Sequence, residues 1–191
     1  MHIWIDIDKA KHIPLLKALI NELKSRGHII TITAENKKEI KIALKQYQID
    51  AKIIGSVFSI FGIFLDFSNS LRCALLMNYI KEKESVDIVF SNGSIPLLSA
   101  SFNKDLPMIL LIMNIKEKFN NLHIGHTKCF FLLPDNISPD ELKAAFYDTD
   151  RVFSFSSILL NSDIEQNSKF IKEITNKIEY LKEHLPAKLK G

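Results

Sequence analysis

The chain has 191 residues, of which 47% are hydrophobic and 25% are charged, and its 25 basic and 22 acidic side chains give a formal net charge of +3. A chain of this length buries enough surface to fold without a disulfide or a metal. The small net charge, with no cluster of arginines or of basic and aromatic residues, argues against nucleic-acid binding. The sequence has no run of about 18 apolar residues, so we expect no membrane-spanning helix.

Two further features indicate where the protein works. Asp6 and Asp8 interrupt the N-terminal residues with negative charge, which is unlike a signal peptide. Cys73 and Cys129 lie far apart and lack the spacing of a redox or metal motif. We therefore expect two free thiols and a cytoplasmic protein, because thiols stay reduced in the cytoplasm.

Residues 1–33 predict a strand, a loop, a helix and a second strand. The strand His2–Ile7 is short and apolar, and the helix after it has one apolar face formed by Leu15, Leu16, Leu19, Ile20 and Leu23. Pro14 suits the first turn of this helix, and Gly27 suits a left-handed cap at its end. A strand over residues 28–33 completes a parallel, right-handed βαβ unit. Ligands bind beyond the carboxyl ends of such strands, an edge that here carries Asp6, Asp8, Lys9 and His12.

The next segments predict a second helix, a short strand and an unusual apolar stretch. Asn36 and Glu39 have the spacing of a capping box at the start of a helix. A strand over residues 51–54 follows, and the stretch from Ser56 to Phe67 then contains four phenylalanines without a strand or helix period. This stretch is either a loop packed on the core or an apolar surface for a partner protein, a lipid acceptor or a membrane.

The middle of the chain alternates between strands and helices. A helix over residues 70–84 is expected to turn an apolar side inward, formed by Leu71, Leu75, Leu76, Tyr79 and Ile80. Four more strands and two more helices are predicted over residues 86–90, 107–113, 129–133 and 152–155, and over residues 95–102 and from Ser138. Strands that are apolar at nearly every position belong to sheets covered on both faces. The predicted fold class is α/β, with a three-layer, Rossmann-like, mostly parallel sheet of six to seven strands.

The C-terminal segment predicts one amphipathic helix. From Ile164 to Leu185 the apolar residues recur every three or four positions, with lysines and glutamates between them. The helix either packs on its own sheet or forms a seam with a second copy of the chain, as in a coiled coil. We expect two parts, a Rossmann-like domain over residues 1–160 and a helix and tail over residues 161–191.

Familiar catalytic motifs are missing from the sequence, among them GxGxxG, the Walker A loop, GxSxG and HExxH. His123 and His126 lie three residues apart without a convincing third ligand, so we expect no metal site. His12 is the strongest catalytic candidate, because a histidine just beyond the first strand can take a proton from a hydroxyl near neutral pH. Asp6 and Asp8 lie close enough in the chain to orient it. The alternative is an exposed loop histidine.

A second candidate segment is the turn Ser91-Asn92-Gly93-Ser94, which connects a predicted strand to a predicted helix. Gly93 allows the backbone to approach a ligand closely. The N–H groups of such a turn suit an anion or a sugar hydroxyl. The alternative is ordinary turn chemistry with no ligand.

At these residues the chain resembles a known family. IWID, His12, ELKSRGH and ITAEN are similar to the opening of the archaeal and bacterial family 354 of domains of unknown function (DUF354). The similarity continues at VDIVFSNGS and runs from Met1 to about Phe155. That family is similar to the N-terminal half of GT-B glycosyltransferases and of UDP-GlcNAc 2-epimerases. The resemblance implies a Rossmann-like half-domain that binds the acceptor, with His12 in the place of the catalytic base.

The resulting hypothesis is a glycosyltransferase-like, acceptor-side half-domain that works with a separate donor-binding partner or with a second copy of itself. His12, helped by Asp8, would deprotonate the acceptor hydroxyl. A sugar or lipid-linked acceptor would be held by Lys9, Ser91, Asn92, Gly93, Ser94 and Asn114. We expect no cofactor and, at most, peripheral membrane contact. The alternative is a non-catalytic binding or assembly module that retains the fold without the chemistry.

Overall fold

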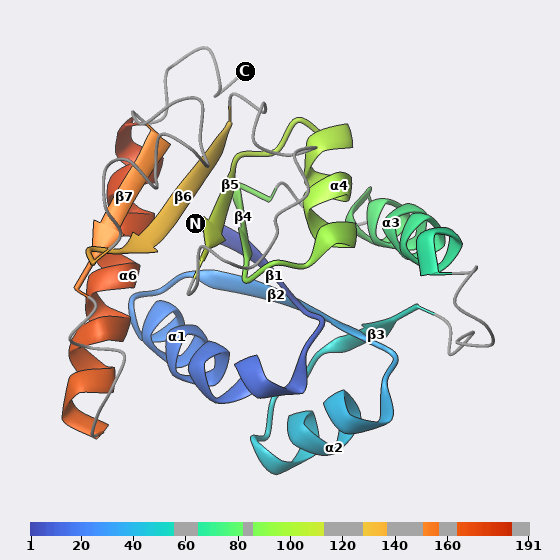
Figure 1. The fold of residues 1–191 in the computed structure, drawn as a ribbon, viewed down its shortest axis with the longest axis horizontal. Helices are drawn as coiled ribbons and strands as arrows, with labels where there is room; N and C mark the ends of the chain where they lie inside the picture. Colours follow the sequence, from blue (N-terminus) through green and yellow to red (C-terminus); the bar gives the residue numbers. More distant parts are fainter. Residues whose placement is uncertain (56–64, 82–85, 113–127, 137–150, 157–163, 185–191) are drawn as a thin grey trace.

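The computed structural model describes residues 1–55, 65–81, 86–112, 128–136, 151–156 and 164–184. Within these residues, seven strands form one sheet in the order β3-β2-β1-β4-β5-β6-β7, and each neighbouring pair is parallel (Figure 1). The strands are β1 (His2–Ile7), β2 (Ile29–Glu35), β3 (Lys52–Ile54), β4 (Ile88–Ser91), β5 (Met108–Leu111), β6 (Cys129–Pro134) and β7 (Val152–Phe155). The predicted α/β class is therefore confirmed.

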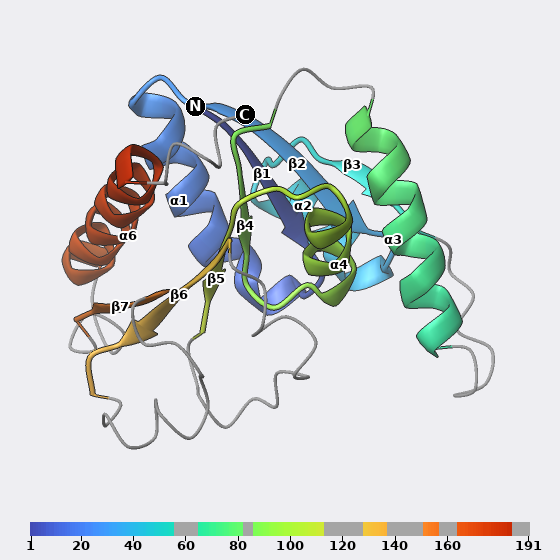
Figure 2. The ribbon, with the colours of Figure 1, turned by 90° about the horizontal axis from the view of Figure 1, so that it is seen from above.

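Helices cover both faces of this sheet. They are η1 (Ala10–His12), α1 (Ile13–Ser25), α2 (Lys38–Gln46), α3 (Leu65–Lys81), α4 (Ile95–Asn103) and α6 (Ile164–His184). Figure 2 shows α1 and α6 on one side of the sheet and α3 and α4 on the other. The three predicted layers are present, and each outer layer buries its own set of apolar side chains against the sheet.

Alternation along β1 divides its side chains between the two cores. Ile3, Ile5 and Ile7 pack with the apolar residues of α1 and α6, while Trp4 packs with those of α3 and α4. All four are at most 1% exposed. A central strand with both faces covered must be apolar at nearly every position, and the buried Asp6 is the exception in β1.

The first helix forms much as its sequence predicts. Pro14 lies in its first turn, where the missing N–H is no loss, and Gly27 follows its end with φ of +80°. The buried side of α1 consists of Ile13, Leu16, Leu19, Ile20 and Leu23. Leu15, predicted to face inward, is only partly buried.

The start of α2 differs from the predicted capping box. The residue before the helix is Lys37, and no side chain caps the first turn. The Asn36 amide instead donates from Nδ2 to the Gly55 carbonyl, 3.2 Å away at the end of β3. Asn36 therefore connects two strand ends rather than starting a helix, because this tertiary partner competes with the local one.

The predicted inner side of α3 is right at Leu76 and Ile80 and wrong at Leu71 and Leu75. Leu71 and Leu75 are 38% and 39% exposed, whereas the buried positions include Arg72, Leu76 and Ile80. Apolar residues lie on nearly all sides of α3, so their spacing does not mark Leu71 and Leu75 as the exposed ones. Arg72, rather than Leu71 or Leu75, lies on the buried side of α3.

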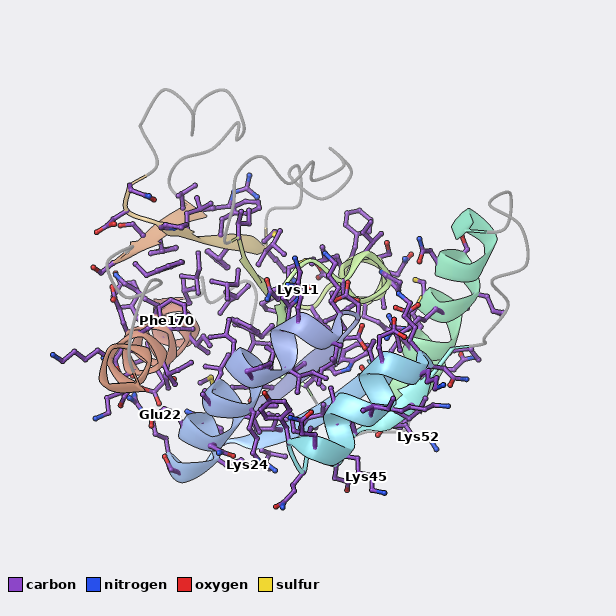
Figure 3. All side chains as sticks on the ribbon, turned by 60° about the horizontal axis from the view of Figure 1, so that its bottom comes forward. Lys11, Glu22, Lys24, Lys45, Lys52 and Phe170 are labelled. Atoms are coloured by element: carbon purple, nitrogen blue, oxygen red, sulfur yellow. The ribbon has the colours of Figure 1, made fainter. Side chains whose placement is uncertain are left out.

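The last described helix completes the core on the α1 side. The buried side of α6 consists of Phe170, Ile171, Ile174, Ile178 and Leu181, all at most 4% exposed. These residues share one core with β1 and α1. Figure 3 shows Phe170 on α6 and Glu22 on the neighbouring α1. The apolar side of α6 is thus covered by its own chain, which leaves its outer side for any contact with a second copy.

Five polar side chains hold α6 against the turn between α1 and β2, and we call them the anchor cluster: Glu22, Arg26, His28, Asn176 and Glu179. Arg26 Nη1 donates to Asn176 Oδ1 at 2.7 Å and to Glu179 Oε2 at 2.8 Å. Arg26 also donates to Glu22, and His28 Nε2 lies 2.8 Å from the other oxygen of Glu179. One arginine therefore ties the first helix to the last described one.

Some predicted features lie outside the described residues. They are Asn114, His123, His126, the helix from Ser138, Leu185 and most of the stretch from Ser56 to Phe67. For Ile164 only the backbone is described. Among the described helices, none combines the length and the apolar character that crossing a membrane requires.

Candidate functional site

The sheet brings two of the predicted polar loops to one edge. β1 ends at Ile7 and β4 ends at Ser91, and the two strands pair in parallel with Ile5 opposite Phe90. Residues 8–12 and 92–94 therefore leave the same carboxyl edge from neighbouring strands. This is the edge at which α/β sheets of this kind bind ligands.

Beneath this edge lies a buried polar network centred on Asp6. One carboxylate oxygen, Oδ1, accepts from Thr33 Oγ1 at 2.6 Å and from Arg72 Nη2 at 2.7 Å, and Oδ2 accepts from Ser94 Oγ at 2.5 Å. Trp4 Nε1 donates to the same Thr33 hydroxyl at 3.1 Å. Asp6, predicted at the edge, is only 2% exposed and so lies beneath the surface rather than on it.

Arg72 is the residue that sequence reasoning missed. Its guanidinium pairs with Asp6, donates from Nε to the Ile54 carbonyl at 3.0 Å and lies 3.5 Å from Ser94 Oγ. The side chain reaches this position from α3 and passes Gly55, where a β-carbon would come within 3.3 Å of Arg72 Cδ. A signal was available, since Arg72 precedes the buried Leu76 and Ile80 at a spacing of four residues.

The two serines of the β4 turn are used inside the protein. Ser91 Oγ accepts from the backbone N–H groups of Gly93 and Ser94 at 3.2 and 3.0 Å, and Ser94 Oγ donates to Asp6. Both serines are fully buried. Of the four predicted binding residues in this turn, Asn92 and Gly93 are left to face a ligand directly.

Asn92 and Asn36 carry polar atoms that the fold does not satisfy. Among the described residues, neither Asn92 Nδ2 nor Asn36 Oδ1 has a hydrogen-bond partner, although both atoms are buried. Leaving such an atom unpaired is costly, so its presence in a native protein calls for an explanation. The two residues follow β4 and β2, on either side of β1, so both orphaned atoms belong to the predicted edge. A hydroxyl-rich ligand could supply the missing donor and acceptor.

Asp8 and His12 occupy the loop between β1 and α1. His12 ends η1, immediately before α1, and is partly buried, while Lys9 is exposed. Burial, with a smaller contribution from the negative charge of Asp6, raises the pKa of Asp8 from 3.8 to about 6. The positive charges of Lys9 and Arg72 oppose this rise. A carboxyl group that titrates close to neutral pH is suited to proton transfer.

The arrangement can bind and polarise a small polar molecule. The loops offer a partly buried histidine, a carboxyl group with a raised pKa and an unsatisfied amide. Gly93, with φ of +97°, adds a backbone that can be approached closely. Among the described residues, no three His, Cys, Asp or Glu side chains come together in a way that could hold a metal ion.

An all-parallel sheet with β1 and β4 as neighbouring inner strands defines a Rossmann-like α/β protein. Its similarity to solved structures shows that the fold is glycosyltransferase-like (GT-B). Within that class the chain belongs to the family described as protein of unknown function (DUF354), whose family model matches residues 1–180. The predicted resemblance is therefore confirmed. No curated protein matches the sequence.

Solved glycosyltransferase structures share the fold. MurG of Acinetobacter baumannii is 15% identical, with a TM-score of 0.59 over 82% of this chain and 45% of MurG. A glycosyltransferase from Rickettsia africae ESF-5 is 16% identical, with a TM-score of 0.54 over 91% of this chain and 49% of the other. Arabidopsis thaliana UGT89C1, solved with UDP, is 9% identical, with a TM-score of 0.54 over 87% of this chain and 51% of the other. The chain thus spans about half the length of each.

Proposed function

We propose that the chain is the acceptor-side half of a glycosyltransferase and works with a donor-binding half supplied by another polypeptide or by a second copy. The observation that carries this proposal is the parallel pairing of β1 with β4, which brings His12 and Asp8 to the same edge as Asn92 and Gly93. The family and the fold support it, because about half of each similar glycosyltransferase corresponds to these residues.

In the proposed reaction, His12 takes the proton of the acceptor hydroxyl. The acceptor oxygen then bonds to the anomeric carbon of the donor sugar, and the bond from that carbon to the nucleoside diphosphate breaks, so that the diphosphate leaves with the electron pair. Asp8 stabilises the charged histidine when it is itself ionised, which its pKa of about 6 permits at neutral pH. Asn92 binds an oxygen of the acceptor through its unsatisfied Nδ2, and Lys9 and Asn114 complete the proposed contacts.

We further propose a cytoplasmic location and a sugar or lipid-linked acceptor. Cys73 and Cys129 are free thiols, which suits a reducing compartment. Burial raises the pKa of Cys129 to about 12, which keeps that thiol protonated and unreactive. The domain limits proposed from the sequence, residues 1–160 and 161–191, are retained. A homodimer could use the outer side of α6.

The test is release of UDP. The chain is expressed with a tag in its native host, proteins that co-purify are identified, and each complex is mixed with UDP-sugars and candidate acceptors. We expect the native chain in its complex to release UDP. The His12→Ala variant should lower the rate of UDP release by roughly 10²–10⁴-fold. His2→Gln is the matched control, because His2 begins β1 at the opposite edge, where its ring bonds Thr31. Equal turnover by His12→Ala and the native chain would reject His12 as the base.

The non-catalytic alternative has one observation in its favour. The hydroxyls of Ser91 and Ser94 form hydrogen bonds within the protein, so they stabilise the fold rather than contact a ligand. If a co-purifying partner binds tightly but no complex releases UDP, the chain is a binding or assembly module that retains the fold.

A further inference from the structure

The hydrogen bonds around Asp6, which we call the Asp6 network, connect several strands and helices at the carboxyl edge of the sheet. Its members come from four elements: Asp6 from β1, Thr33 from β2, Arg72 from α3 and Ser94 from the residue before α4. Through the Ile54 carbonyl, Arg72 also reaches β3. Each of these four side chains is at most 3% exposed. One network therefore joins the ends of four neighbouring strands beneath the candidate site.

Stability alone is a poor reason to bury an ion pair here. Removing a carboxylate and a guanidinium from water costs about as much as their attraction returns, and a well-packed apolar pair often stabilises a core equally well. Charged groups add geometric specificity, because the hydrogen bonds between a guanidinium and a carboxylate have defined directions. Both oxygens of Asp6 are committed, to three donors in total, so its rotamer and those of its partners are fixed together.

We propose, on the basis of the function proposed above, that Arg72 is a positioning residue that holds the turn after β4 in register with the loop after β1, acting through Asp6 and Ser94. The chain of contacts runs from Arg72 to Asp6, from Asp6 to Ser94, and from the Ser94 backbone to Ser91. Asn92 and Gly93 lie between those two serines. Their position relative to Asp8 and His12 therefore depends on an arginine that does not itself reach the surface.

The same pair also sets the charge beside Asp8. Burial is the main reason that the pKa of Asp8 is raised, the negative charge of Asp6 raises it further, and Lys9 and Arg72 lower it. Asp6 and Arg72 thus act on Asp8 in opposite directions. Replacing either one changes the titration of Asp8 in a predictable sense, which gives a readout separate from folding stability.

The test compares three full-length variants without any substrate. Arg72→Met removes the charge and keeps much of the volume, and Arg72→Lys keeps the charge but loses the fork of donors. Lys128→Met is the matched control, since Lys128 is only 8% exposed and is bonded to Asp105 at the opposite edge, before β6. The two readouts are the carbon-13 NMR titration of the Asp8 carboxyl and the hydrogen exchange of the Gly93 and Ser94 amides.

Arg72→Met is expected to raise the pKa of Asp8 by a small amount, because Arg72 is the weakest of the charges acting on it, and to speed exchange of the Gly93 and Ser94 amides about tenfold. Arg72→Lys should leave the pKa near its native value while exchange remains fast. Lys128→Met should lower the melting temperature without moving either readout. The proposal is overturned if Arg72→Met moves neither readout, or if Lys128→Met moves both as strongly.

A milder variant covers the case in which Arg72→Met does not fold. Ser94→Ala removes only the hydroxyl that Asp6 accepts from, and it should speed exchange of the Gly93 and Ser94 amides while the protein stays folded. Unchanged exchange in that variant also overturns the proposal. No measurement in this set uses a sugar or a partner, so failure of the glycosyltransferase proposal would show in the UDP assay and not here.

Discussion

Asp8 lies where burial makes its negative charge costly. Its pKa is raised to about 6 in the folded protein, against 3.8 for the unfolded chain. The folded state therefore binds the Asp8 proton more tightly than the unfolded state does. This contribution to stability is fully present below pH 3.8 and is lost as the pH rises through about 6.

The variant Asp8→Asn has no carboxyl group at this position, so it should not lose stability as the pH rises through about 6. We expect it to be more stable than the native chain at pH 7, by on the order of 2 kcal/mol, and about equally stable below pH 3.8. Urea unfolding at a series of pH values measures the difference. Asp50→Asn, at an exposed position before β3, is the control and should show no such pH dependence. A constant difference at all pH values would contradict the assignment.

For single residues of the candidate site, the sequence predicted the position better than the role. Asp8, His12, Asn92 and Gly93 follow directly from strand ends and turns, which local patterns reveal. Asp6 and the two serines of the turn were placed at the correct edge, but their side chains bond inward. Arg72 was missed because its partners are distant in sequence, Asp6 by 66 residues and Ser94 by 22. Spacing along one helix carries no record of such partners.

Among the elements, α6 contributes as many buried apolar side chains as α1 to the core that they share. The Ile178 side chain is fully buried there, in the same core as β1 and α1. Ile178→Ala should lower the free energy of unfolding by about 2–4 kcal/mol, since it deletes buried methyl groups and leaves a cavity. Lys172→Ala, on the exposed side of the same helix, should change it by less than about 0.5 kcal/mol. Equal effects in denaturant unfolding would mean that α6 is not packed as described.

The anchor cluster predicts a dependence on acid. Burial raises the pKa of Glu179, but hydrogen bonds from His28 and Arg26 outweigh it and hold that pKa below its usual 4.5. Stability from Glu179 is therefore present above pH 4.5 and is lost as the pH falls through the lowered value. Glu179→Gln should be less stable than the native chain at pH 7 and should lose that deficit in acid.

Thermal melts at pH 7 and near pH 3 would measure this effect. Glu183→Gln, an exposed position on the same helix, provides the comparison and should match the native chain at both pH values. If Glu179→Gln keeps its full deficit in acid, the anchor cluster stabilises α6 by shape rather than by charge.

Elements differed in how well the sequence predicted them. Strands β1 and β7 have the predicted bounds, because buried parallel strands are short apolar runs between turns. Helix α1 was predicted from one apolar face between a proline and a glycine. Helix α3 lacks such a face, and the prediction put Leu71 and Leu75 on the wrong side. The capping pair Asn36 and Glu39 failed because Asn36 found a partner on another strand.

For the whole molecule, the proposed division of labour predicts weak nucleotide binding. If the donor half is supplied elsewhere, these 191 residues alone should bind UDP with a Kd weaker than about 0.1 mM. Isothermal titration calorimetry with UDP and with UDP-sugars measures this directly. Micromolar affinity would place the donor site within this chain and would reject the proposed half-site.

The architecture as a whole could be predicted because it depends on the order of strands and helices along the chain rather than on particular side-chain contacts. Strands that alternate with helices produce a parallel sheet with right-handed crossovers, and this rule fixes the layers before any contact is known. The buried network beneath the site could not be predicted in this way. It depends on how far each helix is rotated about its axis, which the apolar residues of α3 do not fix because they lie on nearly all of its sides.

The position of β1 also bears on how the chain folds as it leaves the ribosome. β1 is synthesised before the other strands of the sheet, yet one of its two neighbours is β4, so one edge of β1 has no partner until residue 91 has emerged. Helix α6, which covers Ile3 and Ile5 together with α1, is made later still, and the Asn176 partner of Arg26 lies 150 residues further along the chain. Long-range pairing of this kind folds slowly and leaves apolar edges exposed meanwhile. The nascent chain should therefore depend on chaperones until most of it has been made.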